Sequence, residues 1–393
     1  MSTSVFDVVE MAPDDPILGL NEAFKTDPRK EKVNLSIGVY CTEEGKVPLL
    51  KVVEQTEKKL AEAGAPHTYL PISGVQKLIF GPDSEVVKTK RAATVQSLGG
   101  TGALKVGADF LATVLKNPEA VVSAPTWQNH VAIFESAGFK VGSYPYYDKK
   151  TGEIDFPAML ESLKGLKKDT VVILHACCHN PTGVDLTQEQ WAQVVDVCRD
   201  KGLIPFLDIA YQGFGAGLNE DAGSIRQFAD SGIPFFISNS FSKSFSLYGE
   251  RIGALTVVCK SEEEAKRVNS KLKSVIRANY SNPPAHGAKI VSAVLNDPEL
   301  LQQWHEDLKG MRERIKEMRH LLAEALKKEG AKVDFSFIED QNGMFSFSRL
   351  TPEQVQRLKD EFGVYAVKSG RICVASLNKA NVDYTAKAIK EVL

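Results

Sequence analysis

Short apolar runs alternate with amphipathic segments through the middle of the chain. Two of the amphipathic segments, 127–138 and 187–202, have helical spacing, and the second opens with the capping pattern Thr-Gln-Glu-Gln. Strands that are apolar on both faces and separated by helices predict an α/β fold, with a mostly parallel central sheet flanked by helices. The predicted strands are rich in β-branched and aromatic residues and lie in 120–124, 170–178, 203–211, 233–240 and 252–259.

The pattern changes near residue 300. A long amphipathic helix is predicted over 300–330, followed by the short apolar segments FSFI, GMFSFS, VYAV and RICVA, a helix over 351–363 and a final helix. This predicts a second, smaller α+β domain. We expect a large domain over 41–300 and a small domain over 301–393. The N-terminal segment 1–40 is expected to complete the small domain and to contribute to a dimer contact.

The composition narrows the class of protein. The 393 residues are 43% apolar and 25% charged, as in an ordinary globular enzyme. The net charge of −2 gives no reason to expect a nucleic acid or an anionic membrane as partner. The N-terminal segment is acidic and lacks the apolar stretch of a signal peptide, and the six cysteines are scattered. These features predict a cytoplasmic location with reduced thiols.

One lysine among small hydroxyl residues is a candidate for chemistry. Residues 238–254 read SNSFSKSFSLYGERIGA, so Lys243 follows a predicted buried strand, and Arg251 follows it with a glycine on either side. For an isolated lysine, a solvated loop position is the ordinary interpretation, because lysine is rarely buried without a partner. The other motifs are therefore needed to interpret Lys243.

Glycines open a predicted helix after residue 98. Gly99, Gly100 and Thr101 bring backbone N–H groups and a hydroxyl to the positive end of that helix, which suits a phosphate. The motif has neither the Gly-Lys-Ser/Thr of a P-loop nor the spacing of a dinucleotide fingerprint. A tight glycine turn without a ligand explains it equally well.

The stretch HACCHNPTG invites a zinc interpretation through His175, Cys177, Cys178 and His179. Zinc needs four converging ligands, whereas adjacent side chains at a strand end are expected to point to opposite faces. We therefore predict no metal site. The Asn-Pro-Thr-Gly that follows is typical of a turn, in which Asn180 either donates to a ligand oxygen or has only a structural role.

Asp208 lies inside an otherwise apolar strand, where a carboxylate is costly unless a cation pairs with it. Tyr211 lies at the end of the same strand and could reach the same cavity. Each of these motifs ends a predicted strand or opens the helix that follows it, which is where open α/β sheets bind their ligands. A phosphate cradle, a lysine and a buried aspartate are what pyridoxal 5′-phosphate requires, since the lysine forms its Schiff base and the aspartate keeps its ring nitrogen protonated.

Ordered motifs over the whole length resemble the aspartate/aromatic aminotransferase family of fold-type I pyridoxal-phosphate enzymes. The motifs are APDDPILGL, NLSIGVY, GGTGAL, HNPTG, DIAYQGF, SFSKSFSLYGERIGA, RANYSNPPAHGA, NGMFSFS and SGRICVA. The resemblance implies that the large domain binds pyridoxal 5′-phosphate. It implies a ping-pong transamination through pyridoxamine phosphate, in which aspartate, tyrosine or phenylalanine gives its amino group and 2-oxoglutarate receives it.

The resemblance also implies roles for the residues in these motifs. Lys243 matches the Schiff-base lysine that also moves the proton, and Asp208 matches the partner of the pyridine nitrogen, with His130 behind it. Tyr211 and Asn180 match residues that hydrogen-bond the phenolic oxygen of the cofactor.

Further residues match the family's contacts to the cofactor ring and phosphate. Trp127 matches the residue that stacks on the ring. The phosphate ligands implied are Gly99, Gly100, Thr101, Ser240, Ser242, Arg251 and, from the neighbouring subunit, Tyr69.

Two arginines match the residues that hold a dicarboxylate substrate. Arg371 matches the residue that clamps the α-carboxylate, with Gly38, Trp127 and Asn180 on the same side. Arg277 matches the residue that a partner subunit contributes to the distal carboxylate. The resemblance therefore implies a homodimer with shared active sites, whereas from the pattern alone each arginine is typical of a surface position.

Other functions remain open at this point. One alternative is an enzyme whose main activity is on aromatic amino acids, and another is a lyase or decarboxylase on the same fold, because fold does not fix reaction. A catalytically inactive binding protein is a third reading, which the combination of Lys243, Asp208 and Arg371 disfavours. Asn282 and Thr101 resemble the aspartate-specific members, while the residues expected near the pocket mouth are less polar: Cys41, Val47 and Thr68.

The chain departs from the family pattern after Gln76. It is shorter there by about two helical turns, roughly seven residues. Either a helix has been lost, or the sequence omits residues of a mobile loop, which is the outcome we expect.

Overall fold

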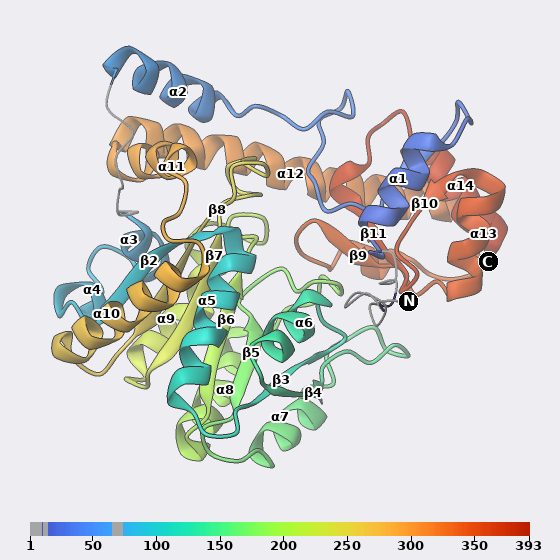
Figure 1. Cartoon of the computed structure of the whole chain (residues 1–393). Helices are drawn as coiled ribbons and strands as arrows, with labels where there is room; N and C mark the ends of the chain where they lie inside the picture. Colours follow the sequence, from blue (N-terminus) through green and yellow to red (C-terminus); the bar gives the residue numbers. More distant parts are fainter. Residues whose placement is uncertain (1–9, 11–14, 65–73) are drawn as a thin grey trace, which may run out of the picture.

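A seven-stranded sheet forms the centre of the computed structural model, which describes residue 10 and residues 15–64 and 74–393 (Figure 1). The strand order is β2-β8-β7-β6-β5-β3-β4. β8 runs antiparallel to both of its neighbours, and the other adjacent pairs are parallel, which confirms the predicted α/β fold with a mostly parallel sheet. The strands are β2 (Ala92–Leu98), β3 (Glu119–Ala124), β4 (Lys140–Pro145), β5 (Val171–His175), β6 (Ile204–Ile209), β7 (Phe235–Ser240) and β8 (Ile252–Val258).

The central strands end earlier than the apolar runs that predicted them. Every residue of β5, β7 and β8 is buried, as expected for strands covered on both faces. β5 nevertheless ends at His175 and β6 at Ile209, although the runs continue to 178 and 211. The residues beyond these ends lie outside the strands and are buried, except for the half-buried Ala210, and they form the loops that carry the candidate site.

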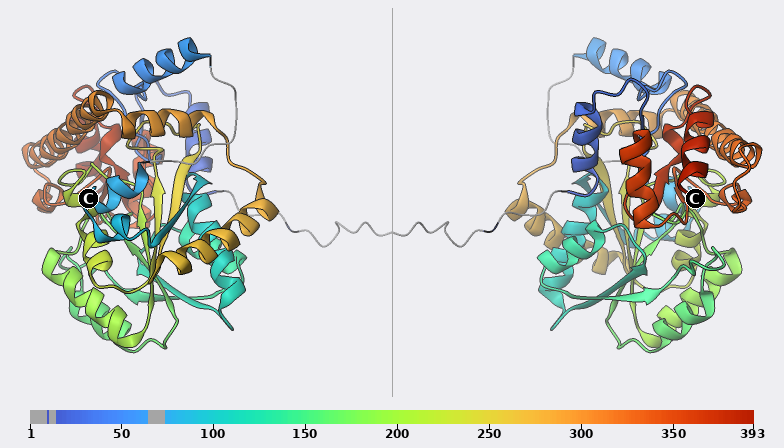
Figure 2. Two further views of the ribbon diagram at one scale, coloured as in Figure 1. Left: turned by 90° about the vertical axis from the view of Figure 1, so that its left-hand side faces the viewer. Right: turned by 90° about the vertical axis from the view of Figure 1, so that its right-hand side faces the viewer.

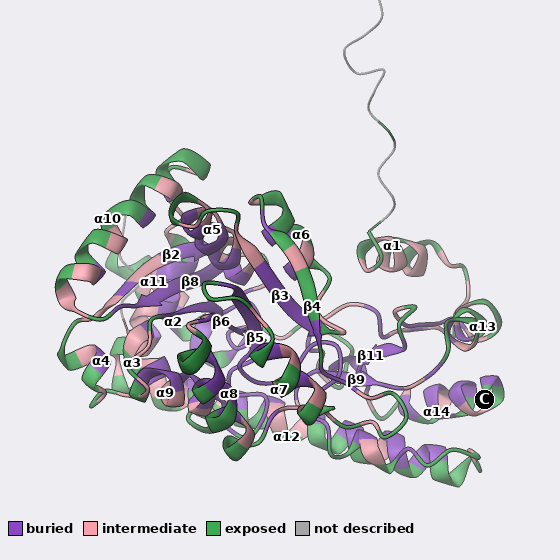
Figure 3. Cartoon of the chain, turned by 90° about the horizontal axis from the view of Figure 1, so that it is seen from below, coloured by how far each residue is buried: buried purple, intermediate pink, exposed green. Residues whose placement is uncertain are grey.

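Helices cover both faces of the sheet. One face packs against α5 (Gly99–Val114), α6 (Asn129–Ser136) and α10 (Glu262–Asn279) through a single apolar cluster. α5 begins at Gly99, as predicted, and α8 has the predicted capping box between Thr187 and Gln190. Figure 3 shows the buried strands between helices whose outer sides are exposed. The other elements of this part are α7 (Phe156–Lys164), α8 (Gln188–Lys201), α9 (Gly223–Asp230), α3 (Val75–Phe80), α4 (Glu85–Lys88) and η1 (Glu220–Ala222).

One long helix, α12 (Pro298–Lys328), runs along the whole molecule beside α2 (Lys51–Ala63) and α11 (His286–Asn296) (Figure 1). At 1.5 Å per residue its 31 residues extend about 46 Å. Its first half packs into the sheet-side core through residues such as Trp304 and Ile315, and its second half packs into another core from Met318 onward. Despite its length, neither α12 nor any other helix of the described chain is apolar enough to cross a membrane.

The C-terminal part is built around two small sheets. β9 (Phe345–Phe347) pairs antiparallel with β11 (Arg371–Cys373), and β1 (Val33–Asn34) pairs parallel with β10 (Val364–Tyr365). The N-terminal α1 (Leu18–Thr26) lies beside the C-terminal helices, as the right-hand view of Figure 2 shows. The remaining elements are α13 (Pro352–Phe362), α14 (Val382–Val392), η2 (Ser336–Ile338) and η3 (Val374–Ser376).

The domain limits 1–40, 41–300 and 301–393 stay a prediction. Within α12 the change from one core to the other lies between Ile315 and Met318, inside the predicted small domain. Val33 and Leu35 belong to the same apolar cluster as the C-terminal helices.

Gly253 in β8 lies where the sheet meets the start of α5. A Cβ atom there would lie 2.5 Å from the carbonyl carbon of Gly99 and 2.6 Å from the backbone oxygen of Asn239. Backbone atoms of a sheet and a helix start cannot give way as a flexible side chain does. We expect Gly253→Ala to lower the free energy of unfolding by about 1–3 kcal/mol, measured by urea unfolding followed by circular dichroism.

Gly249→Ala is the matched control, because no described atom beyond its chain neighbours lies within 4 Å of a Cβ at Gly249. Equal stability of the two variants would contradict the proposed backbone crowding at Gly253.

Candidate active site

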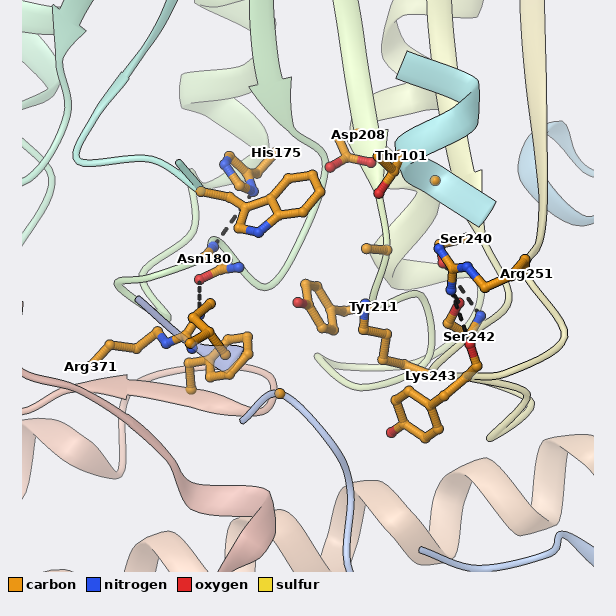
Figure 4. A pocket seen from close by; sticks show the side chains of 17 residues that line it. Thr101, His175, Asn180, Asp208, Tyr211, Ser240, Ser242, Lys243, Arg251 and Arg371 are labelled. Carbon is orange, nitrogen blue, oxygen red and sulfur yellow. Dashed lines mark hydrogen bonds between the residues drawn. The ribbon is translucent and has the colours of Figure 1, made fainter. Parts of the chain in front are cut away.

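A cavity of about 200 Å³ lies beyond the carboxyl ends of the central strands, facing the β9–β11 ribbon (Figure 4). Residues from both ends of the chain reach it, including Ile17 and Arg371. The structure brings most of the predicted site residues together here. Those that line the cavity are Gly38, Gly100, Thr101, Trp127, Asn180, Asp208, Tyr211, Ser240, Ser242, Lys243, Arg251 and Arg371.

Asp208 lies near the end of β6 and is buried. Its partner is an imidazole, since His130 Nε2 donates to Asp208 Oδ2 over 3.1 Å. Thr126 Oγ1 lies 2.9 Å from His130 Nδ1, which favours the tautomer that carries its proton on Nε2. Burial raises the pKa of Asp208, but the hydrogen bond from His130, together with the electrostatic influence of His130 and His175 and the Ser238 hydroxyl, holds the pKa below its usual value. The second oxygen, Oδ1, has no hydrogen-bond partner in the described part of the chain.

Lys243 lies in the turn after β7, with its Nζ 5.3 Å from the centroid of the Tyr211 ring. Its pKa is lowered to about 8, because burial penalises the ammonium form. The charges of Arg251 and Arg371 lower this pKa further, while Asp208 opposes them. A neutral amine is therefore accessible at Lys243 near neutral pH, which an ordinary surface lysine does not offer.

Arg251, Ser242 and the start of α5 form a cradle for an anion. Arg251 Nη1 donates to Ser242 Oγ over 3.4 Å and to the Tyr248 carbonyl over 3.0 Å. Gly100 and Thr101 line the cavity at the positive end of α5. A guanidinium, hydroxyls and a helix N-terminus in one place suit a phosphate dianion.

Gly99 serves this cradle differently from the prediction. Its N–H donates to the Arg251 carbonyl over 3.0 Å, so it is not available to a ligand, and Gly99 does not line the cavity. Its φ is +68°, and a Cβ there would lie 2.7 Å from Arg251 Nη2. Gly99 therefore allows Arg251 to approach the helix start.

Arg371 on β11 is a buried cation held by neutral groups. Its Nη1 donates to Asn180 Oδ1 over 3.2 Å and its Nη2 to the Ser36 carbonyl over 2.8 Å. Among the described residues, its Nε has no hydrogen-bond partner and no carboxylate forms an ion pair with the guanidinium. The guanidinium carbon lies 4.3 Å from the centroid of the Phe345 ring. A buried guanidinium without a counter-ion is suited to bind a carboxylate.

Five residues that line the cavity were not assigned to it from the sequence: Ile17, His175, Ala210, Tyr248 and Phe345. The Tyr248 hydroxyl accepts the N–H of Tyr40 over 2.9 Å, which joins the Lys243 loop to the N-terminal segment. Tyr248 lies in the same stretch as Lys243 and Arg251, and that proximity was the available signal. Phe345 gives no such signal, because in sequence it is indistinguishable from a core phenylalanine.

Some predicted residues do not reach the cavity. Arg277 lies exposed in the last turn of α10, where Nη1 donates to Ser281 Oγ over 3.4 Å. Its role in a partner's site stays a prediction. Cys41 and Val47 do not line the cavity either. Tyr69 and Thr68 lie outside the described residues.

The cysteine pair corrects one argument from the sequence. Cys177 and Cys178 do not point to opposite faces, because β5 ends at His175 and Cys178 has a φ of +50°. Together with Asp221 they form the one group of candidate metal ligands found in the described residues, with ligand atoms within 4.8 Å. The Asp221 oxygens, however, already accept four backbone N–H groups from residues 213–217, which leaves little capacity for a metal.

Comparison with known proteins gives full-length matches. Residues 30–389 match the family model described as aminotransferase class I and II. An aspartate aminotransferase of Pseudomonas aeruginosa is 56% identical and an aromatic-amino-acid aminotransferase of Escherichia coli is 50% identical; both matches cover 99% of this chain and 100% of the relative.

Solved structures agree with these sequence matches. An aromatic-amino-acid aminotransferase from Burkholderia pseudomallei, covalently bound to pyridoxal phosphate, has a TM-score of 0.97 at 56% identity over 100% of both chains. A psychrophilic aromatic amino acid aminotransferase from Psychrobacter, cocrystallised with aspartic acid, has a TM-score of 0.96 at 48% identity over 99% of both chains.

The lowered pKa of Lys243 predicts a pH dependence of cofactor uptake. Below about pH 8 the amine is protonated and not nucleophilic, and above it the amine is neutral. We expect the rate at which cofactor-free enzyme takes up pyridoxal 5′-phosphate to rise with pH and to level off above about 8, followed by visible absorbance. Lys243→Ala, as control, should lack the covalent absorbance band. A rate that keeps rising to about pH 10, as for an ordinary lysine, would contradict the assignment.

Proposed function

The chain belongs to the class I and II aminotransferase family, and we propose that it moves the amino group of aspartate or of an aromatic amino acid to 2-oxoglutarate. It is a pyridoxal-phosphate-dependent transaminase. One observation carries the assignment of the site. A lysine amine, an open aspartate oxygen and a buried guanidinium come together in a single cavity (Figure 4).

The groups left open in this cavity fit pyridoxal 5′-phosphate. Asp208 Oδ1 is free to hold the ring nitrogen, and Tyr211 and Asn180 are close enough to the cavity to hold the phenolic oxygen. Trp127 offers an aromatic face to the ring. When bound, the cofactor supplies an aldehyde that takes up amines and a protonated ring that accepts electron density from the substrate's Cα. The phosphate would be held by Gly100, Thr101, Ser240, Ser242 and Arg251.

The protein's own residues then act on the amino acid. Lys243, neutral near pH 8, is placed to take the proton from Cα and return it. Arg371 orients the substrate because its planar fork binds a carboxylate with two hydrogen bonds. Asp208 keeps its negative charge, since its pKa lies below the usual value, and so stabilises positive charge at the ring nitrogen.

The substrate range and the dimer are inferred together. The relatives named above include both aspartate and aromatic-amino-acid aminotransferases, and the α-carboxylate that Arg371 would bind is common to all their substrates. Arg277 is exposed and lies away from its own chain's cavity. We therefore assign Arg277 to the cavity of a second copy, where it would meet the distal carboxylate of aspartate or 2-oxoglutarate. This requires a homodimer.

Removing the charge of Asp208 should impair turnover without removing the cofactor. Asp208→Asn keeps the side chain's volume and its contact with His130 but loses the carboxylate. We expect kcat to fall by at least about 10²–10³-fold, the scale of one preorganised electrostatic contact, while visible absorbance still shows full cofactor content. A variant with near-parental kcat would contradict the role of Asp208.

The two arginines separate the substrate classes. Arg371→Ala should weaken reaction with aspartate and with phenylalanine alike. Arg277→Ala should weaken only the reaction with dicarboxylate substrates, because phenylalanine has no distal carboxylate. Removing the arginine from a charge-assisted pair leaves the substrate carboxylate without its partner and costs about 2–5 kcal/mol of binding free energy. This corresponds to a loss of tens- to thousands-fold in kcat/KM.

Single-turnover half-reactions with each amino acid, followed by absorbance, measure these effects without 2-oxoglutarate. Equal losses for aspartate and phenylalanine in Arg277→Ala would refute its distal role. An Arg277→Ala protein that remains dimeric by light scattering makes the comparison valid.

A further inference from the structure

Arg349 adopts a backbone conformation that is rare for a residue other than glycine. Its φ is +63°, in the left-handed region, where the Cβ atom of an L-residue crowds the following carbonyl. Strain of this kind persists only where the surroundings hold the residue, and it often marks a functional contact. The side chain of Arg349 contacts residues on both sides of the cavity region.

The guanidinium of Arg349 contacts the 148–153 turn, which belongs to the part of the chain that contains the seven-stranded sheet. Nη2 donates to the Thr151 carbonyl over 3.1 Å, and the guanidinium carbon lies 3.8 Å from the centroid of the Phe337 ring. A Cβ at Gly152 would lie only 1.6 Å from Nη2 and 2.5 Å from the guanidinium carbon. The guanidinium therefore occupies a space that is open only because residue 152 is glycine.

The turn that leaves this space open, residues 148–153, is connected to the central sheet. It follows β4, and it is closed by the bonds Asp148 N–H to the Glu153 carbonyl and Gly152 N–H to the Asp148 carbonyl. Tyr147 at its base forms a bridge with Ile154 and an edge contact with the Phe347 ring, centroids 5.3 Å apart. Arg349 and Phe347 lie on the other side, in the segment that starts with β9.

That segment is bonded directly to the strand that carries Arg371. Phe347 of β9 is the register partner of Arg371 on β11. Both the N–H and the hydroxyl of Ser348 donate to the carbonyl of Gly370, over 2.9 and 2.7 Å. Arg349 is therefore separated from the backbone of Arg371 by one ladder of hydrogen bonds, and Figure 1 shows this ribbon facing the strand ends.

We propose that Arg349 is a positioning residue for Arg371. By joining the β9–β11 ribbon to the 148–153 turn, it fixes the distance between the guanidinium of Arg371 and the sheet side of the cavity. Arg371 makes one side-chain hydrogen bond to that side, with Asn180. A second contact at Arg349, two residues beyond its register partner Phe347, therefore steadies it. The inference rests on the proposed role of Arg371 in binding the α-carboxylate.

Two substitutions remove the contact from opposite sides. Arg349→Gly removes the guanidinium and relieves the φ strain. Gly152→Ala places a methyl group where the guanidinium lies, while Arg349 itself remains. In single-turnover half-reactions of the holoenzyme, we expect each to raise the apparent dissociation constants of aspartate and phenylalanine by about three- to tenfold, the net scale of one hydrogen bond with its packing. The rate constant at saturation and the ratio of the two dissociation constants should stay near the parental values.

Two further measurements distinguish positioning from general stability. Hydrogen–deuterium exchange should increase in peptides covering 343–349 and 371–376 in both variants. The double variant should be no worse than the more affected single variant, because both substitutions remove the same contact. Arg349→Lys, which retains one donor without the planar fork, should recover part of the affinity.

The chain offers matched controls for the backbone effects. Gly138→Ala places a Cβ at a φ of +90°, where a Cβ meets no described atom within 4 Å, and Lys90→Gly relieves a φ of +53° at an exposed residue. Neither should change the dissociation constants.

Unchanged dissociation constants in Arg349→Gly and Gly152→Ala, a loss for only one of the two amino acids, or additive effects in the double variant would overturn the inference. Arg371→Ala, measured alongside, separates the two proposals. If Arg371→Ala weakens both amino acids and the Arg349 variant does not, only the positioning role fails. If Arg371→Ala has no effect, the proposed carboxylate site itself fails.

Discussion

The hydrogen bond from His130 to Asp208 is the interaction on which the site depends. It lets a carboxylate stay charged inside the sheet although the described residues bond only one of its oxygens. A buried charge without any partner would take up a proton or disrupt the strand. With His130 in place, the other oxygen can face the cavity, and the positive groups opposite it can remain without carboxylates of their own. The cavity is thus electrostatically incomplete in the protein alone, and its ligands complete it.

The central fold could be predicted from the apolar pattern of its buried strands. The charged residues of this cavity could be predicted because they interrupt that pattern. Buried strands identify themselves by continuous apolar residues, and against that background Asp208 and Lys243 are conspicuous. The rule that ligands bind beyond the carboxyl ends of strands then places both in one region. The arginines needed more: in sequence, Arg371 looks like any surface arginine, and only its likeness to a family motif singled it out.

The contacts that the sequence did not predict are those set by tertiary packing. Gly99 was assigned to the ligand, yet its N–H is used by Arg251, a residue 152 positions away. Cys178 was assumed to continue a strand, and its left-handed backbone reverses the direction of its side chain. Phe345 supports Arg371 from a segment with no distinguishing pattern. For Gly99 and Phe345 the partner lies in a distant element of the fold, so no local periodicity carries the information.

The long helix α12 has a consequence for how the molecule comes apart. Its first half covers the sheet-side core and its second half covers the core of the C-terminal part, without a break in its backbone hydrogen bonds. When this helix unfolds, both cores lose part of the apolar surface that covers them. Unfolding of one core therefore exposes the other. We therefore expect the two structural units to unfold in one cooperative transition. We also expect that two fragments made by dividing the chain near residue 300, where its composition changes, would not fold alone.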